Sequence, residues 1–367
     1  MLEHSCRELY FPDRFADSPF AMKRLPRDPI RFDLVNAFAE FGCEEKVSLR
    51  DPATATDGFV ERTRESVRRS LSNEALLHGL RTQSMFEALL VSLGAVELLK
   101  QEDAGEIYAF DETLEVPDFR LVLRDGSQLL VEVKNFYQTN NARKSFEVDE
   151  EYLEGLIRYS TTMRCDLFFA IYWVKWNVWT LVPPDVFQFQ GNKRSLDLLD
   201  AMKANHMASL GDYAIGTRFP LSFVMYADTT KPRSIGPDQT GTFTVANVEV
   251  YCAGHRITDL VEMGIATYLM FYGKWEYEAE LKLAGNEIEA VEHRWVPDED
   301  HQQGFEIVGS LSELFSTFYR FRTQEEGELT RLRLDVTPGF LGQLIPEDHK
   351  GHNLPLWRFR LQPSSPC

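Results

Sequence analysis

The chain has 367 residues, enough for two domains, and 44% of them are hydrophobic, so substantial cores can be buried. Its five cysteines include no CxxC pair, which argues against a disulfide scaffold and a structural zinc site and favours a reduced, cytoplasmic protein. The net charge of −18 argues against a protein that covers phosphate backbones with a broad basic surface.

A membrane role is not expected. The first residues contain no basic segment followed by an apolar run, so they do not resemble a secretory signal. The most apolar stretch, residues 167–182, is interrupted by Lys175, Asn177 and three tryptophans, well short of a length that spans a bilayer.

The first quarter of the chain divides into a proline-rich segment and a helical one. Residues 1–57 are rich in proline and are expected to form an arm with at most a short helix at 32–41. Apolar residues then recur at three- and four-residue spacings, which predicts two helices. Ser72 or Asn73 would cap the second helix, and Gly94 would end it.

After Gly94 the apolar period changes to that of strands. Asp125 and Gly126 form a strong hairpin-turn signal between two of them. The predicted order is helix, three strands, helix and strand. The last five of these elements are expected at 95–101, 115–124, 128–136, 149–163 and 166–173.

The rest of the chain predicts further strands and two helices, without a motif that indicates chemistry. A helix is expected at 196–208, capped by Ser195, and residues 229–241 read as a linker. A helix at 311–319 carries a capping box. The predicted parts are an arm (1–57), an α/β domain (58–235) and an α+β region (236–367).

The informative feature is Pro117-Asp118, thirteen residues, and then Glu132-Val133-Lys134. Side chains alternate along a strand, so Glu132 and Lys134 share one face, and the hairpin can bring Asp118 beside Glu132. Two carboxylates and an ammonium group suit hydrolysis of a phosphodiester with Mg²⁺. Asp118, Glu132 and the Val133 carbonyl would bind the metal, and Lys134 would hold water and offset developing charge.

These elements resemble the PD-(D/E)XK nuclease superfamily, which includes restriction endonucleases and junction-resolving enzymes. The resemblance covers about residues 74–182 and implies a restriction-endonuclease-like α/β core, a mixed central sheet flanked by helices, followed by an α+β C-terminal region. It also implies a Mg²⁺- or Mn²⁺-dependent endonuclease acting on nucleic acid, with DNA favoured, in restriction, defence or repair. Glu87, on the preceding helix, matches the acidic residue that often completes the metal site, and Gln83 lies one turn earlier on the same face. The expected partner is nucleic acid. Many members act as dimers, but nothing in the sequence fixes the oligomeric state, so a second copy or a partner protein are both left open.

Other interpretations of the same residues stand beside this one. Glu132 and Lys134 can form an exposed ion pair on an edge strand, Asp118 can be a turn residue after proline, and Glu87 a solvated helix residue. Three tryptophans, at 173, 176 and 179, could stack bases, although alternation along strands favours packing within the sheet. The whole chain could then keep the fold as an interaction module, or use its acidic surface to bind a basic partner.

Overall fold

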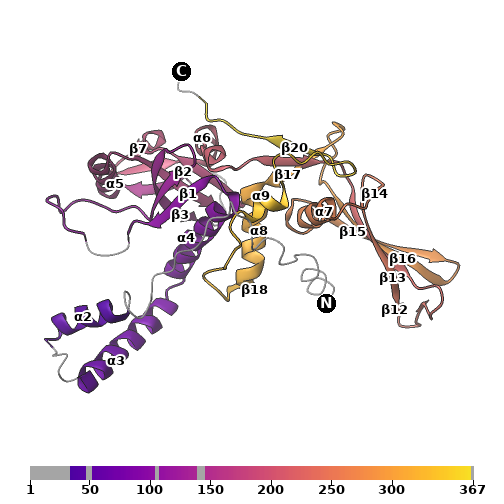
Figure 1. The fold of residues 1–367 in the computed structure, drawn as a ribbon, viewed down its shortest axis with the longest axis horizontal. Helices are drawn as coiled ribbons and strands as arrows, with labels where there is room; N and C mark the ends of the chain where they lie inside the picture. The colour runs from indigo at the N-terminus through magenta and orange to yellow at the C-terminus, as the bar shows by residue number, and fades with distance from the viewer. Residues whose placement is uncertain (1–33, 47–51, 104–106, 139–144, 365–367) are drawn as a thin grey trace.

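The computed structural model describes residues 34–46, 52–103, 107–138 and 145–364, so most of the predicted arm lies outside the described residues. Within the described residues, three helices come first: α2 (Val35–Glu44), α3 (Pro52–Leu71) and α4 (Glu74–Leu93). In Figure 1, α2 and α3 project from the body and α4 runs into it. The predicted caps are confirmed, because the Asn73 side chain accepts from the Leu76 N–H and Gly94 ends α4 with φ +80°.

A five-stranded sheet in the order β1-β2-β3-β5-β6 follows α4. Strands β3 and β5 are parallel and the other neighbours are antiparallel, and α5 crosses over from β3 to β5. The predicted order of helix, three strands, helix and strand is therefore confirmed for this sheet and its helices, and one short strand that was not predicted, β4 (Phe146–Asp149), precedes α5 in another sheet. The bounds are Val96–Gln101 (β1), Phe119–Leu123 (β2), Gln128–Phe136 (β3), Glu150–Met163 (α5), Asp166–Trp173 (β5) and Val178–Val182 (β6).

The two faces of this sheet are buried by different helices. Val131 and Val133 belong to the apolar cluster that contains α4, whereas Leu130 packs with α5 on the other face. Trp173 and Trp179 are fully buried, which confirms that they are packing residues. The alternation along β3 therefore puts Glu132 and Lys134 on the α5 face.

Two three-stranded antiparallel sheets lie beside this core, in the orders β4-β8-β7 and β17-β9-β20. Their strands are β4 (Phe146–Asp149), β7 (Gln188–Gln190), β8 (Lys193–Leu196), β9 (Ala214–Thr217), β17 (Glu306–Ser310) and β20 (Leu356–Phe359).

The predicted helix at 196–208 is split into α6 (Leu198–Lys203) and the 3₁₀ helix η4 (Met207–Leu210), and a further 3₁₀ helix, η3 (Pro184–Val186), precedes β7. Helix α6 is capped by Asp197, because Ser195 is paired within a strand.

A seven-stranded sheet occupies the other end of the molecule (Figure 1). The segment 229–241, predicted as a linker, contributes two of its short strands, so the predicted domain boundary at 235 falls within this sheet. Its strands are β10 (Leu221–Ala227), β11 (Ser234–Ile235), β12 (Gly241–Thr242), β13 (Val245–Cys252), β14 (His255–Ile257), β15 (Glu276–Ala284) and β16 (Glu287–Val296).

Helix α7 (Leu260–Tyr272) packs on this second sheet and is absent from the sequence prediction. Its residues are apolar nearly all round, as in a buried helix, so they show no amphipathic period. In the described part of the chain, no helix has the length and apolarity needed to span a bilayer. The remaining elements are α8 (Leu311–Thr323), β18 (Gln324–Glu325), β19 (Glu328–Leu329) and α9 (Phe340–Leu344).

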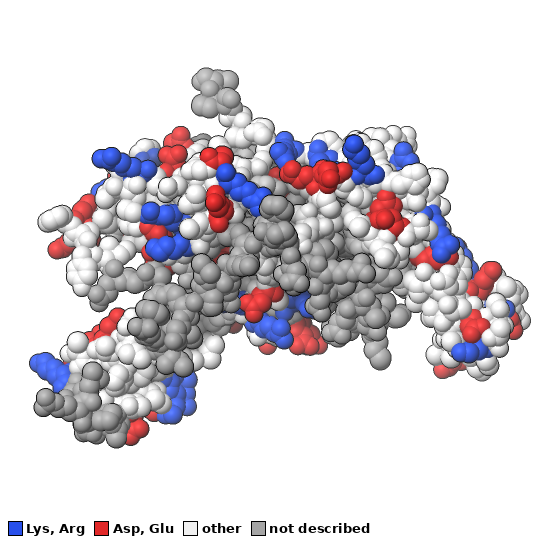
Figure 2. Space-filling model, in the orientation of Figure 1, with Lys and Arg blue, Asp and Glu red and all other residues white. Residues whose placement is uncertain are grey.

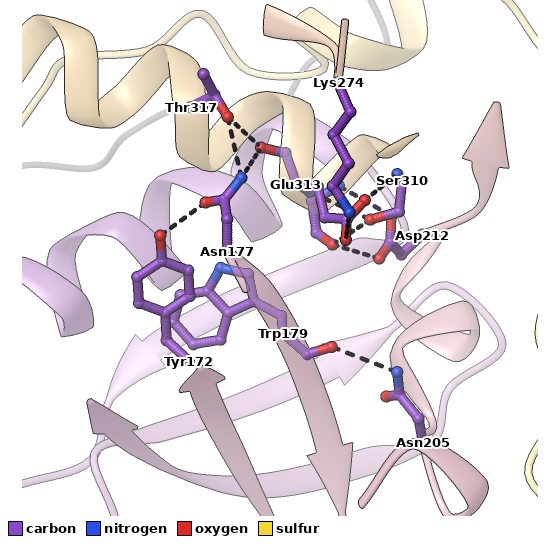
Figure 3. Close-up of polar contacts among 10 residues, drawn as sticks. Tyr172, Asn177, Trp179, Asn205, Asp212, Lys274, Ser310, Glu313 and Thr317 are labelled. Atoms are coloured by element: carbon purple, nitrogen blue, oxygen red, sulfur yellow. Dashed lines mark hydrogen bonds and ion pairs between the residues drawn. The ribbon is translucent and has the colours of Figure 1, made fainter. Parts of the chain in front are cut away.

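Helix α8 joins the second half of the chain to the first sheet. Its predicted capping box, Ser310 with Glu313, is present. The amide of Asn177, in the β5–β6 turn, donates to the Glu313 carbonyl (2.9 Å) and to Thr317 Oγ1 (3.0 Å), and Figure 3 shows this side chain directed at α8. The Trp179 indole N–H donates to Ser316 Oγ (2.9 Å). One apolar cluster runs through α4, the first sheet, α7 and α8.

Candidate metal and phosphodiester site

The β2–β3 hairpin brings the predicted site residues together. Phe119 lies opposite Val131, so Asp118, one residue before β2, reaches the strand beside Glu132. The turn is fixed by the Asp125 carboxylate, which accepts from the Ser127 N–H (2.9 Å). Register in a hairpin follows from its turn, and this local constraint places two carboxylates side by side.

Asp118 is buried, with 7% of its surface exposed, and two groups hold its carboxylate. Gln83 of α4 donates its amide N–H to Oδ1 (2.5 Å), and the Val133 backbone N–H donates to Oδ2 (2.6 Å). Both hydrogen bonds fix the orientation of this carboxyl group before any ligand binds. Gln83 therefore lies within the site, on the helix face that the sequence indicated.

Glu132 is more deeply buried than Asp118, at 3% exposed, and one of its oxygens has two partners. Nζ of Lys134 lies 2.6 Å from Glu132 Oε1, and the Tyr152 hydroxyl donates to the same oxygen (2.6 Å). The Lys134 ammonium also donates to the Tyr152 oxygen (3.3 Å). The other oxygen, Oε2, is buried and has no hydrogen-bond partner among the described residues. A buried carboxylate oxygen without a partner is costly, so a ligand there would compensate it.

Burial, and after it the neighbouring Glu132 carboxylate, raise the pKa of Asp118 to about 7. Burial also raises the pKa of the Tyr152 hydroxyl, so it stays protonated and remains a donor to Glu132. Asp118 is therefore partly protonated near neutral pH when no cation is bound. A cation between the two carboxylates would displace that proton.

This shifted pKa predicts how the stability of the metal-free protein depends on pH. The folded-state pKa of Asp118, about 7, exceeds the usual 3.8, so folding takes up a proton between these values. The contribution of Asp118 to the free energy of unfolding is fully present below about pH 4 and is lost as pH rises through about 7. Melting temperature in EDTA is expected to fall across this window, measured by circular dichroism.

The matched variant for this pH experiment is Asp118→Asn, which cannot titrate. Its melting temperature should depend less on pH than that of the wild type. Some dependence should remain, because burial also raises the pKa of Asp212 to about 6. An unchanged pH profile in the variant would contradict the assignment of the effect to Asp118.

Glu87 is the predicted site residue that the structure does not bring to the others. Its two carboxylate oxygens accept from the same guanidinium nitrogen of Arg333, at 3.1 and 3.0 Å. This ion pair ties α4 to the C-terminal segment, one helical turn from Gln83. The role of Glu87 as a metal ligand stays a prediction.

Two residues near the site were not singled out from the sequence. Tyr152 is an aromatic residue on the buried side of α5 and reads as a core residue until the crossover of α5 is known. Asp103 follows β1, and its pKa is raised by burial and then by the Glu132 carboxylate, which places it in the same electrostatic environment. No pattern in the sequence distinguishes Asp103 from the other acidic residues of the chain.

The donor set fits a hard divalent cation of the magnesium type. Within the described residues, no group of three or more His, Cys, Asp or Glu side chains is arranged to hold a metal. Two carboxylates, one with an unpartnered buried oxygen, are nevertheless what Mg²⁺ commonly takes from protein, because it keeps several waters and substrate phosphate oxygens as ligands. The site therefore suits Mg²⁺ or Mn²⁺ better than a cation that needs a complete protein cage.

The mixed central sheet, with α4 and α5 on opposite faces and the acidic hairpin at its centre, is the α/β arrangement of sheet and flanking helices expected from the sequence. Among solved structures, the chain is similar to Hjc from Archaeoglobus fulgidus, a Holliday junction resolvase, at 14% identity and a TM-score of 0.28, over 35% of this chain and 94% of that one. No protein-family model matches the chain, and no curated protein matches it significantly.

Proposed function

We propose that this protein is a metal-dependent nuclease that hydrolyses phosphodiester bonds in nucleic acid, with DNA as the first substrate to test. The observation that carries the proposal is the state of the Glu132 carboxylate: it is buried, one oxygen is held by Lys134 and Tyr152, and the other has no hydrogen-bond partner among the described residues. By resemblance, the setting would be restriction, defence or repair.

Asp118, Glu132 and the Val133 carbonyl would hold Mg²⁺ or Mn²⁺. A residue in an extended strand directs its N–H and C=O to the same edge, and the Val133 N–H already faces Asp118. When bound, such a cation supplies a water of lowered pKa and polarises a phosphoryl oxygen. Gln83 would keep Asp118 oriented while substrate binds.

Lys134 would act directly on the reacting groups. Its side chain is 28% exposed, whereas that of Glu132 is 4% exposed, so Lys134 can reach water and phosphate oxygens. There it would hold the attacking water and donate to oxygens that gain negative charge as the phosphodiester bond breaks. Tyr152 would keep Lys134 and Glu132 together through its hydroxyl.

The surface charge agrees with a small site better than with a long binding track. Figure 2 shows acidic and basic side chains interspersed over the face in view. With a net charge of −18, the protein has little general attraction for phosphate backbones. The proposal therefore rests on the local chemistry of the site.

The test is cleavage of plasmid DNA, single-stranded DNA and RNA by the full chain with Mg²⁺, Mn²⁺ or EDTA. Glu132→Gln keeps the shape of the side chain but removes its charge, and it is expected to abolish both cleavage and Mn²⁺ binding measured by calorimetry. Glu87→Gln is the matched comparison, and its effect on Mn²⁺ affinity decides whether Glu87 is a ligand. If the wild type cuts none of these substrates and binds no Mn²⁺, the fold serves as an interaction module instead.

A further inference from the structure

Strand β15 forms an open edge of the seven-stranded sheet. It pairs with β16 on one side, and among the described residues no strand pairs with its other side. All nine of its residues are exposed. Figure 1 shows this end of the sheet projecting from the body, so the edge is accessible. An open edge offers unpaired N–H and C=O groups to another strand.

The two faces of β15 differ in chemistry. Leu281 and Leu283 lie on one face and are 45% and 46% exposed. Glu278, Glu280 and Lys282 alternate with them on the other face. A partner strand must therefore cover apolar groups on one side and complement charges on the other.

The sequence of β15 complements itself. We propose that β15 pairs antiparallel with β15 of a second copy of this chain, with Leu281 facing Leu281 at the twofold axis. Glu280 of each copy then lies opposite Lys282 of the other, and Ala279 lies opposite Leu283. Opposite charges directly across a strand pair stabilise it, and apolar neighbours on the same face add to this. Such an interface is the same patch on both copies, as a twofold dimer requires.

Neighbouring registers are worse for identifiable reasons. An axis on Glu280 places two glutamates opposite each other, and an axis on Lys282 places two lysines opposite each other. An axis between two residues would put the leucines of the two copies on opposite faces. Lys282 already bonds Glu292 on β16 at 2.6 Å, and its ammonium has further donors for Glu280 of the second copy.

The first measurement is the mass of the full chain by sedimentation equilibrium, which is expected to be twice the monomer's 42.3 kDa. The Glu280→Lys variant places a lysine at position 280 of each copy opposite Lys282 of the other. This repulsion is expected to raise the dimer dissociation constant by about 10-fold or more. Lys282→Glu produces the opposite clash and the same loss. Both residues are exposed, and circular dichroism checks that each variant remains folded.

A mixture of the Glu280→Lys and Lys282→Glu variants is the decisive experiment. One copy presents two basic residues and the other two acidic residues, so the mixture should form a dimer although each variant alone does not. Glu278→Lys is the matched control, since it makes the same change of charge on the same face but lies opposite Ala284. It should leave the dimer intact.

Three results would overturn the proposal. They are a wild-type protein that stays monomeric at every concentration, a Glu280→Lys variant as dimeric as the wild type, and single variants that fail to associate when mixed. None of these results bears on cleavage or metal binding, so the two proposals stand or fall separately.

Discussion

Replacing Lys134 by alanine is expected to lower the cleavage rate by about 100-fold or more, the usual cost of losing a group that stabilises transition-state charge. The loss should lie in the rate and not in metal binding, because Asp118 and both Glu132 oxygens remain. Removing a cation from beside Glu132 should leave Mn²⁺ affinity equal or higher, since one carboxylate oxygen is released. Single-turnover cleavage and calorimetry with Mn²⁺ measure the two effects separately.

The matched control is Lys175→Ala, which removes an exposed lysine that lies over the Trp176 ring in the β5–β6 turn. It should cut at the wild-type rate. If Lys134→Ala instead loses cleavage and Mn²⁺ binding together, with a lower melting temperature, Lys134 has a structural role and its assignment to the reaction is wrong. If the wild type, Lys134→Ala and Glu132→Gln all cut at the same rate, the cutting comes from a contaminating nuclease.

Replacing Trp179 by alanine is expected to cost about 3–5 kcal/mol of unfolding free energy, the usual range for a large aromatic residue in a core. Trp179 is 2% exposed and packs against Phe86 and Tyr172, with ring centroids 5.2 and 4.9 Å away. Its loss also leaves the Ser316 hydroxyl without the indole donor. The cost therefore combines a cavity with a lost hydrogen bond between β6 and α8.

Urea denaturation, followed by circular dichroism and by fluorescence, measures this cost. Because one apolar cluster runs through both halves, both probes should report one transition, shifted to lower urea in the variant. Trp176→Ala is the control, since Trp176 is only partly buried at the edge of the second cluster and should cost much less. Two separate transitions in the wild type would show that the halves fold independently.

The local parts of the fold could be predicted from the sequence. The period of apolar residues, the Asn73 cap and Gly94 define α4, and the Asp125-Gly126 turn fixes the β2–β3 register. Asp118 and Glu132 meet because that register depends only on the hairpin itself. The alternation of β3 then places Lys134 on the same face as Glu132. This part of the site follows from residues within one short segment.

The remaining parts depend on contacts between distant segments. Tyr152 reaches Glu132 only because α5 crosses over the sheet. Arg333, which binds Glu87, lies 246 residues away in the sequence, so no local pattern predicts this contact. Strands β11 and β12 are each two residues long within a segment rich in turn formers, so they read as a linker until β16 supplies a partner.

The placement of α8 has a consequence for how this chain can change over evolutionary time. Helix α8 covers β6 beside α4, and the Trp179 indole donates to Ser316 on α8, so Trp179 is buried in part by residues from the last third of the chain. A protein that exchanged this third for an unrelated segment would expose Trp179 to water. Substitutions at Trp179 and on the inner side of α8 are therefore expected to be inherited together. Recombination at residue 235 should yield few viable descendants.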